Sequence, residues 1–136
     1  MKILFICRGN VGRSQIAETL AKSLLDDKHI ITSAGTKLSG PEQPIGELSP
    51  STDNVIEVMK EEGFDVTGNL RKQVTEEMAE DADKIILVVD DDDPIPNYLL
   101  NNPKVTRWDV QDPKGQTLEF TRNVRDQIKS KITSLI

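Results

Sequence analysis

Several residue types that often carry function or cross-links are scarce in this chain of 136 residues, which has one cysteine, one histidine, one tryptophan and one tyrosine. A single thiol cannot form an internal disulfide, so a small secreted fold held together by disulfide bonds is excluded. Aromatic residues make up 4% of the chain, which leaves few rings to form the walls of a binding pocket. The lone histidine, His29, stands beside no recognisable motif, and we assign it no role.

Net positive charge is also lacking, because 17 basic residues face 23 acidic ones and the formal net charge is -6. This balance gives no electrostatic footprint for nucleic acid, so we expect no nucleic-acid partner. No apolar run approaches the ~18–20 residues needed to cross a bilayer, so we expect no membrane association. The first apolar run is short and is typical of a strand rather than a signal peptide, which favours a cytoplasmic protein.

Short apolar runs alternate with helical patterns along the chain, and this alternation predicts a parallel α/β sheet. The predicted strands are residues 3–6, 29–33, 85–89 and 105–108, and the predicted helices cover residues 14–26, 55–62, a short stretch opening at 75–78, and 120–135. Residues 36–50 contain three prolines and are expected to form a loop. A chain of this length fits one domain, so we predict a single α/β domain over residues 1–136 with helices on both faces of the sheet.

The most informative stretch is the loop from Cys7 to Ser14 (CRGNVGRS), which follows the first apolar run and opens the first predicted helix. Such a loop can point successive backbone N–H groups into one concavity, which makes an anion site. A thiol beside a helix N-terminus and Arg13 should ionise readily. The guanidinium of Arg13 can hold two oxygens of a tetrahedral oxyanion at once. The loop therefore predicts a nucleophile and an oxyanion cradle, as in a phosphatase-type site.

The alternative for Cys7 is that it is a small buried hydrophobic residue at the end of a strand. A packing cysteine does not need the residues that surround it here, namely Gly9, Asn10, Gly12 and Arg13. Glycine and asparagine tolerate positive φ, which we expect of a loop wrapped around an anion. These neighbours favour the functional interpretation.

The arrangement Cys-x5-Arg-Ser at the first strand resembles the signature of the low molecular weight protein tyrosine phosphatases, whose fold and loop the thioredoxin-linked arsenate reductases share. Ile6 precedes the cysteine, where other Cys-x5-Arg phosphatases usually have histidine. The resemblance extends over nearly the whole chain, through the stretches 33–36, 59–63, 82–83 and 112–113. It implies a four-stranded sheet of the phosphotyrosine phosphatase I type, with strand order 2-1-3-4 and no cofactor. That order places the carboxyl end of the first strand at the switch point where ligands bind.

The resemblance also implies roles for individual residues. Cys7 would be the nucleophile and Arg13 would hold the phosphate, while Asp112 of the Asp112-Pro113 pair would be the general acid. The backbone N–H groups of residues 8–13 would bind the oxyanion, and Ser14 would donate a hydrogen bond to the sulfur or cap the helix. The expected substrate-binding residues are therefore Arg8, Gly9, Asn10, Val11, Gly12 and Ser14, with Asn10 fixing the backbone of the loop and Arg8 on its rim.

Two departures leave the activity open. Many small phosphatases carry a second cysteine where this chain has Gly12, and the arsenate reductases of this fold need further cysteines after the third strand. This chain has Asp90–Asp93 there, which we interpret as a solvated loop rather than a metal site. Trp108, interpreted as strand packing, and the stretch Val124–Asp126 look more like the reductase branch. An internal disulfide relay is impossible with one thiol. A reductase that uses an external thiol remains possible.

The sequence therefore leaves three function classes. The first is a cysteine-dependent phosphatase acting on phosphorylated proteins or small aryl phosphates. The second is an arsenate reductase with an external thiol, and the third is a non-catalytic oxyanion or phosphoprotein binder. Lys114 and Gly115 follow the Asp-Pro pair, where aromatic residues often wall a phosphotyrosine pocket, so the substrate is open.

Overall fold

Strands and helices alternate throughout residues 1–135, the part of the chain that the computed structural model describes. In chain order the elements are β1 (Lys2–Cys7), α1 (Arg13–Leu24), β2 (Ile30–Gly35), α2 (Asp53–Glu61), α3 (Glu76–Asp81), β3 (Lys84–Val89), β4 (Val105–Asp109) and α4 (Leu118–Thr133). Two short 3-10 helices, η1 (Ile45–Leu48) and η2 (Asn97–Leu99), lie in the connections. The predicted alternation of elements is confirmed.

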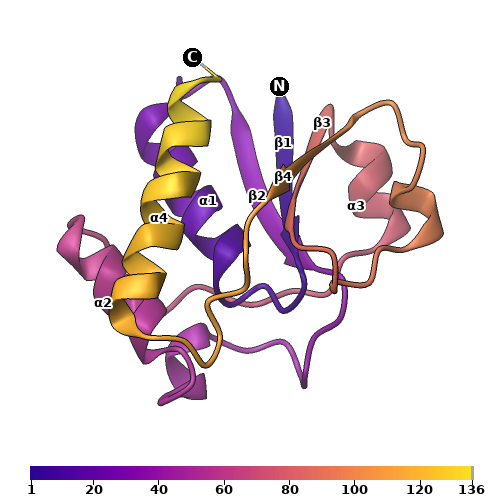
Figure 1. The fold of residues 1–136 in the computed structure, drawn as a ribbon. Coiled ribbons are helices and arrows are strands. Elements are labelled where there is room, and N and C mark those ends of the chain that lie inside the picture. The colour runs from indigo at the N-terminus through magenta and orange to yellow at the C-terminus, as the bar shows by residue number, and fades with distance from the viewer. Residues whose placement is uncertain (136) are drawn as a thin grey trace.

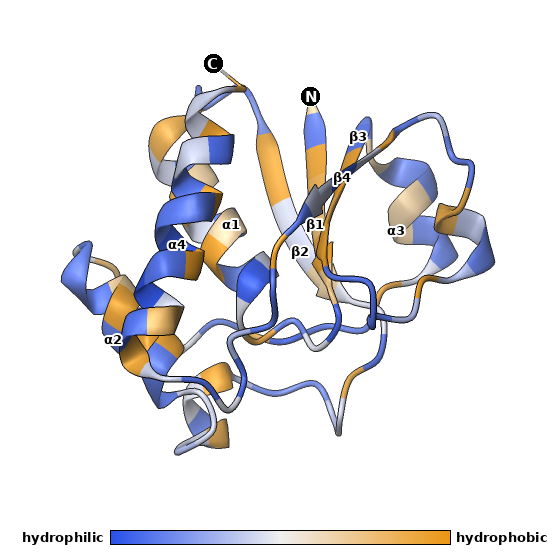
Figure 2. Ribbon diagram, viewed as in Figure 1, coloured by the Kyte–Doolittle hydropathy of each residue, from blue (hydrophilic) through white to orange (hydrophobic). Residues whose placement is uncertain are grey.

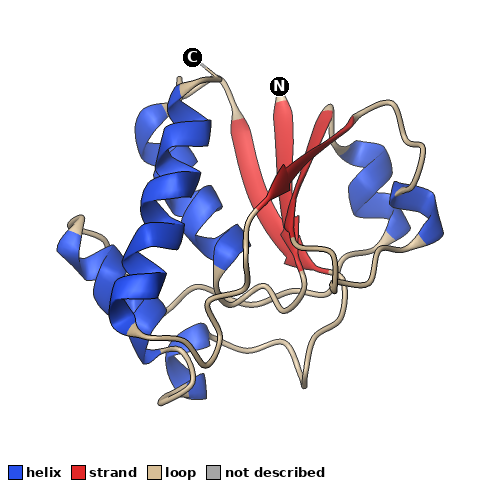
Figure 3. Ribbon diagram, viewed as in Figure 1, coloured by secondary structure: helices blue, strands red, loops and turns tan. Residues whose placement is uncertain are grey.

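The four strands form one parallel sheet in the order β2-β1-β3-β4 (Figure 3). The chain runs from β1 outward to β2 and then crosses β1 to reach β3. The carboxyl end of β1 is therefore the point at which the winding reverses, where α/β sheets bind ligands. Cys7 occupies this end of β1, opposite Gly35 of β2. The predicted sheet, its strand order and the single-domain fold are confirmed.

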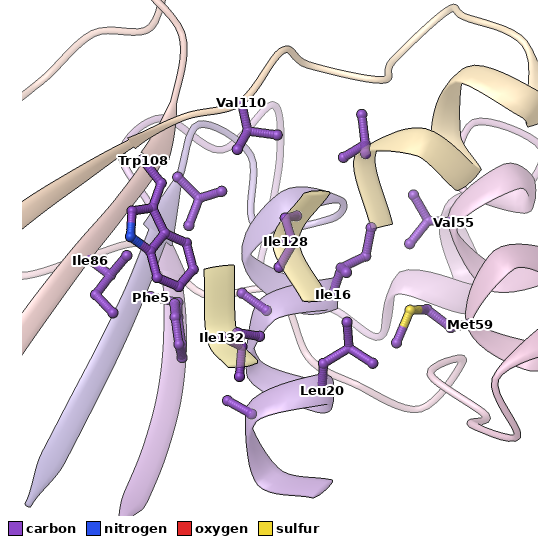
Figure 4. Packing of buried hydrophobic residues seen from close by; sticks show 14 of the residues in the cluster. Phe5, Ile16, Leu20, Val55, Met59, Ile86, Trp108, Val110, Ile128 and Ile132 are labelled. Carbon is purple, nitrogen blue, oxygen red and sulfur yellow. The ribbon is translucent and has the colours of Figure 1, made fainter. Parts of the chain in front are cut away.

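Helices cover both faces of the sheet, with α1, α2 and α4 on one side and α3 on the other (Figure 1). The alternation of side chains along β1 supplies both cores, because Ile3 and Phe5 face the first group while Leu4 and Ile6 face the α3 side. The larger core also contains Trp108, whose ring centroid lies 5.9 Å from that of Phe5 (Figure 4). Trp108 thus packs in the core, as the sequence predicted.

The helices carry one apolar stripe each and are polar elsewhere, which Figure 2 shows for α4 as an alternation of orange and blue. Val124, Ile128 and Ile132 form the buried stripe of α4. Its N-terminus is capped by Thr117, whose hydroxyl accepts a hydrogen bond from the backbone N–H of Phe120 at 3.0 Å. Burial of one such side chain contributes roughly 1.5–3 kcal/mol, so the stripe holds α4 against the larger core.

The connection over residues 36–50 differs from the prediction in one respect. It contains η1, and Ile45 at the start of η1 is fully buried in the larger core. This buried side chain anchors the connection. The residue pattern of the loop does not indicate that Ile45 is buried. No helix within residues 1–135 is long and apolar enough to cross a membrane.

Candidate active site

The loop between β1 and α1 is held from outside by the chain that continues from β2. The backbone N–H of Thr36 donates to the carbonyl of Cys7, and that of Lys37 donates to the carbonyl of Arg8, each at 2.9 Å. Gly35 lies so close that a Cβ there would come within 2.6 Å of the Arg8 carbonyl oxygen. A side chain at Gly35 would push the loop away, so this glycine permits the close approach.

A buried hydrogen-bond network behind the loop centres on Asn10. Its side-chain nitrogen Nδ2 donates to Ser14 Oγ at 2.7 Å and to Ser33 Oγ at 2.9 Å. Its Oδ1 accepts from the backbone N–H of Lys72 at 2.9 Å. Asn10 also has a positive φ of 53°, as predicted for a residue in this loop. The side chain therefore fixes an unusual backbone conformation by tying it to β2 and to residue 72.

The same network orients Ser14 toward the thiol. Ser14 Oγ lies 3.0 Å from Cys7 Sγ, and both side chains are buried. Because Asn10 already donates to Ser14 Oγ, the Ser14 hydroxyl proton is free to point at the sulfur. A hydroxyl in this orientation stabilises a thiolate, since the negative charge accepts the hydrogen bond.

Two expectations about the loop are wrong. Gly9 and Gly12 do not have positive φ, and a Cβ at Gly12 would make only ordinary contacts, the nearest 3.7 Å from Pro113. Asn10 alone supplies the positive φ of the loop, because its side chain compensates the strain through hydrogen bonds. Ser14 does not cap α1, since the helix begins at Arg13 and its N-cap residue is Gly12, without a side-chain cap.

Arg13 is only 2% exposed, and its charge is balanced by carboxylates from the loops after β3 and β4. Its Nη1 donates to Asp93 Oδ2 and to the carbonyl of Val110, each at 2.8 Å. Burial tends to lower the pKa of this guanidinium, but the hydrogen bond to Asp93 and the charges of Cys7, Asp93 and Asp112 raise it above its ordinary value. Arg13 therefore stays cationic at the carboxyl end of β1.

The prediction of a solvated loop at Asp90–Asp93 is wrong for two of its residues. Asp93 is buried and pairs with Arg13, and Asp90 Oδ2 lies 3.9 Å from the same guanidinium. Burial tends to raise the pKa of Asp90, but backbone hydrogen bonds from residues 112 and 92 and the charge of Arg13 lower it. A buried guanidinium needs a counter-charge, and the end of β3 lies beside β1, so these acids provide it.

Asp112 lies on the loop after β4 and reaches the same site. Its Oδ2 is 3.7 Å from Arg13 Nη2, and its side chain is 40% exposed. Its backbone N–H donates to Asp90 Oδ2 at 3.3 Å, which ties the loop after β4 to the loop after β3. The carboxylate thus stands at the open side of the site, where a substrate would enter.

A cavity of about 450 Å³ opens over the loop and contains most of the predicted site. Its lining includes Cys7, Arg8, Gly9, Val11, Gly12, Arg13 and Asp112. Asn10 and Ser14, by contrast, are fully buried behind the loop and support it from below. Within residues 1–135 no aromatic side chain lines this cavity, whose apolar wall consists of aliphatic residues: Leu38, Leu48, Val11, Val55 and Pro113.

Sequence reasoning missed three parts of the site. Asp93 was assigned to a solvated loop, Ser33 was noticed only within a matching stretch, and Arg71 was not singled out. For Asp93 the signal was available in principle, because an acid in the loop after a central strand lies at the edge of the sheet where Arg13 sits. Nothing in the local pattern distinguishes Arg71, which lies in an irregular segment between α2 and α3.

The family model described as low molecular weight phosphotyrosine protein phosphatase matches residues 2–136. The chain therefore belongs to this family, as the motifs of the loop indicated.

Arsenate reductases and tyrosine phosphatases are among the similar curated relatives and solved structures. The glutaredoxin arsenate reductase of Synechocystis sp. is 32% identical over 135 residues, which are 99% of this chain and 95% of the relative. A structure of an arsenate reductase in the phosphate-binding state is 31% identical, with a TM-score of 0.79 and coverage of 98% and 95%. The low molecular weight protein tyrosine phosphatase from T. tengcongensis is 26% identical, with a TM-score of 0.81 and coverage of 99% and 97%.

Proposed function

We propose that this protein is a cysteine-dependent phosphatase that hydrolyses phosphate monoesters through a thiophosphoryl-cysteine intermediate. The observation that carries the proposal is that the only thiol of the chain shares one cavity with a buried arginine and a carboxylic acid. Nucleophile, oxyanion site and proton donor are the three groups that phosphoryl transfer to a thiolate requires. A protein that only binds an oxyanion would not need the proton donor that Asp112 provides.

In the first step the Cys7 thiolate attacks the phosphorus, and the bond from phosphorus to the ester oxygen breaks. The leaving oxygen takes the proton of the Asp112 carboxylic acid. The backbone N–H groups of residues 8–13 and the Arg13 guanidinium bind the phosphoryl oxygens and stabilise the charge that develops there.

In the second step the Asp112 carboxylate removes a proton from water, whose oxygen attacks the phosphorus. The bond from sulfur to phosphorus breaks, which releases phosphate and returns Cys7 as a thiolate. Ser14 supports this departure, because its hydroxyl lies 3.0 Å from Sγ and can hydrogen-bond to the leaving thiolate.

The test is steady-state hydrolysis of para-nitrophenyl phosphate over a range of pH. We expect Cys7→Ser to abolish turnover, and Asp112→Asn to reduce kcat by about 10²–10⁴-fold, the usual contribution of a general acid. Asp27→Asn, an exposed acid near the other end of the sheet, is the matched control and should behave as the wild type. A folded wild-type protein that binds phosphate but shows no turnover would overturn the proposal and favour a binding role.

A second candidate function is arsenate reduction, which is favoured by the 32% identity to a reductase named for glutaredoxin. Reduction of arsenate to arsenite takes two electrons, which two thiols supply when they form a disulfide. Cys7 is the only thiol of this chain, so the second would come from an external thiol. Arsenite release that depends on added glutathione or glutaredoxin, and that Cys7→Ser abolishes, would support this activity.

A further inference from the structure

The cavity carries more positive charge than its one acid can balance. Besides Arg13, its lining includes four further cationic residues: Arg8, Lys37, Arg71 and Lys114. Arg13 is already neutralised by Asp93, Asp90 and Asp112. None of the four others forms a salt bridge within residues 1–135. In a chain with a net charge of -6, this is a local excess of positive charge.

Arg71 differs from the other three because it is buried, with 4% of its surface exposed, whereas Arg8, Lys37 and Lys114 are exposed. Its Nε donates to the carbonyl of Pro41 at 2.8 Å, and its Nη1 donates to Ser39 Oγ at 3.1 Å. Both partners are neutral, and Nη2 donates to no protein acceptor in the described chain. A buried cation without a counter-ion is costly, so such a site is completed by an anion.

The surroundings of Arg71 hold its guanidinium in place beside the phosphate loop. A Cβ at Gly40 would come within 2.8 Å of Arg71 Nη2, so the absence of a side chain there leaves room for the guanidinium. The next residue, Lys72, donates its backbone N–H to Asn10 Oδ1 and accepts from the backbone N–H of Gly35, at 2.9 and 2.8 Å. Arg71 is therefore one residue away from direct contact with the loop that carries Cys7.

The remaining wall of the cavity restricts the organic part of a substrate. Its apolar residues are aliphatic, and within residues 1–135 it offers no aromatic ring that could stack on a phenyl group. Such stacking would contribute about 0.5–1.5 kcal/mol per ring pair, so an aromatic substrate gains nothing of this kind here. A small aliphatic chain of a few carbons fits a wall of leucine, valine and proline.

We propose that the substrate is a small organic phosphate whose carbon chain carries a second anionic group, a carboxylate or a second phosphate, and that Arg71 binds that group. This assignment rests on the proposed phosphatase function, in which the first phosphate occupies the loop. The planar guanidinium suits either oxyanion, because both accept paired hydrogen bonds. A small molecule is favoured over an acidic phosphopeptide, since Arg71 lies inside the cavity and flanking peptide acids would meet only the exposed cations.

The experiment measures binding without turnover. Two series of phosphonates with two to five carbons, ω-carboxyalkyl phosphonates and alkane bisphosphonates, are titrated into the protein by calorimetry, and the methyl esters of the carboxy compounds are titrated for comparison. The ester has the same shape but no second charge. We expect at least one chain length at which the second anion lowers Kd by about tenfold or more in the wild type, and the two series show which anion is preferred.

The quantity compared is the ratio of the Kd of the methyl ester to the Kd of the carboxylate with the same chain. The variant Arg71→Gln should bring this ratio close to one, and Arg71→Lys, which keeps the charge, should retain part of the preference. Lys28→Gln removes one charge from an exposed site away from the cavity and should leave the ratio unchanged. Ratios close to one for every chain length in the wild type would overturn the proposal, and this result needs no variant. A ratio that survives in a folded Arg71→Gln protein would also overturn it, because the preference would then come from the exposed cations.

Failure of the proposed function has a different signature. Hydrolysis of para-nitrophenyl phosphate tests the phosphatase reaction, whereas the phosphonate titration reads the second anion site whether or not the protein hydrolyses esters. If the titration shows a preference for the second anion but no ester is hydrolysed, the anion site is supported and the phosphatase reaction is overturned. Hydrolysis with no preference for a second anion would support the phosphatase reaction and overturn the second anion site.

Discussion

Arg13 shows how one buried residue is stabilised by partners that are distant in sequence. Its side chain is 2% exposed, and its main partner, Asp93, is 80 positions away. Asp93 Oδ2 accepts from Arg13 Nη1 and from the backbone N–H of Asp90, each at 2.8 Å. One carboxylate therefore holds both the arginine of the loop and the turn after β3. Its loss would disturb the site and the fold together.

The first prediction concerns this carboxylate. Asp93→Asn should lower the free energy of unfolding by roughly 1.5–3 kcal/mol, the value of a hydrogen bond to a charged group. Urea unfolding at pH 7 measures the change. Asp92→Asn, at an exposed acid of the same turn that forms no salt bridge within residues 1–135, should shift stability by less than about 0.5 kcal/mol. Equal and small effects of both variants would mean that Arg13 finds sufficient compensation in Asp90 and Asp112.

Helices α2 and α4 pack against each other and are joined at their surface by one carboxylate. Glu61, the last residue of α2, accepts from Arg122 Nη2 and from Arg125 Nη1 of α4, each at 2.7 Å. Hydrogen bonds from Arg122 and then from Arg125 lower the pKa of Glu61 to about 2. This link connects the helix whose residue Val55 lines the cavity to the helix that covers the sheet.

The pKa of Glu61 predicts how stability changes in acid. A free glutamate titrates near ~4.3, so the folded state holds the charged form more strongly than the unfolded state. The stabilisation is fully present above that value and is lost as the pH falls toward 2. Glu61→Gln should therefore be less stable than the wild type at pH 7, with the difference closing near pH 2.

Urea unfolding at several pH values between 2 and 7 measures this difference. Glu57→Gln, on the exposed face of the same helix and with no ion pair to any residue that the structure describes, serves as the control. The proposed link would be refuted if the gap between the wild type and Glu61→Gln stayed constant over this range.

At the scale of the whole molecule, the site joins parts of the chain that only the complete fold brings together. The loop of residues 7–14 lies near the start of the chain, Arg71 lies near its middle, and Asp112 follows the last strand. The sheet order β2-β1-β3-β4 places β1 and β3 at its centre, so the loops after β1, β3 and β4 meet at one edge. Binding of an oxyanion at this edge should therefore stabilise the domain as a unit.

This coupling gives a prediction for thermal stability. Phosphate at about 100 times its Kd should stabilise the folded state by about 2.7 kcal/mol. For a domain of this size that corresponds to a rise in Tm of roughly 5–10 °C. Calorimetry in phosphate and in chloride at matched ionic strength separates specific binding from screening of the net charge. The same Tm in both salts would argue against an oxyanion site.

The fold was predictable to a large extent because its signals are local. The alternation of apolar runs and helical patterns gave all four strands and four α-helices, with ends that differ by a few residues. The loop motif gave Cys7, Arg13 and Ser14, whose mutual positions follow from a strand, a tight loop and a helix start. The loop over residues 36–50 was predicted less well, because the burial of Ile45 depends on a surface that other elements form.

What the sequence by itself determined is therefore the α/β class, the strand order through its family motifs, and a thiol and an arginine in one loop. Only the tertiary structure decided which charges balance Arg13, why Asn10 can hold a positive φ, and that Arg71 faces the cavity with no counter-ion among the described residues. The physical reason is one of range. Backbone periodicity and loop chemistry act between near neighbours, whereas the electrostatics of a buried group depend on every chain segment that the fold brings within a few ångströms of it.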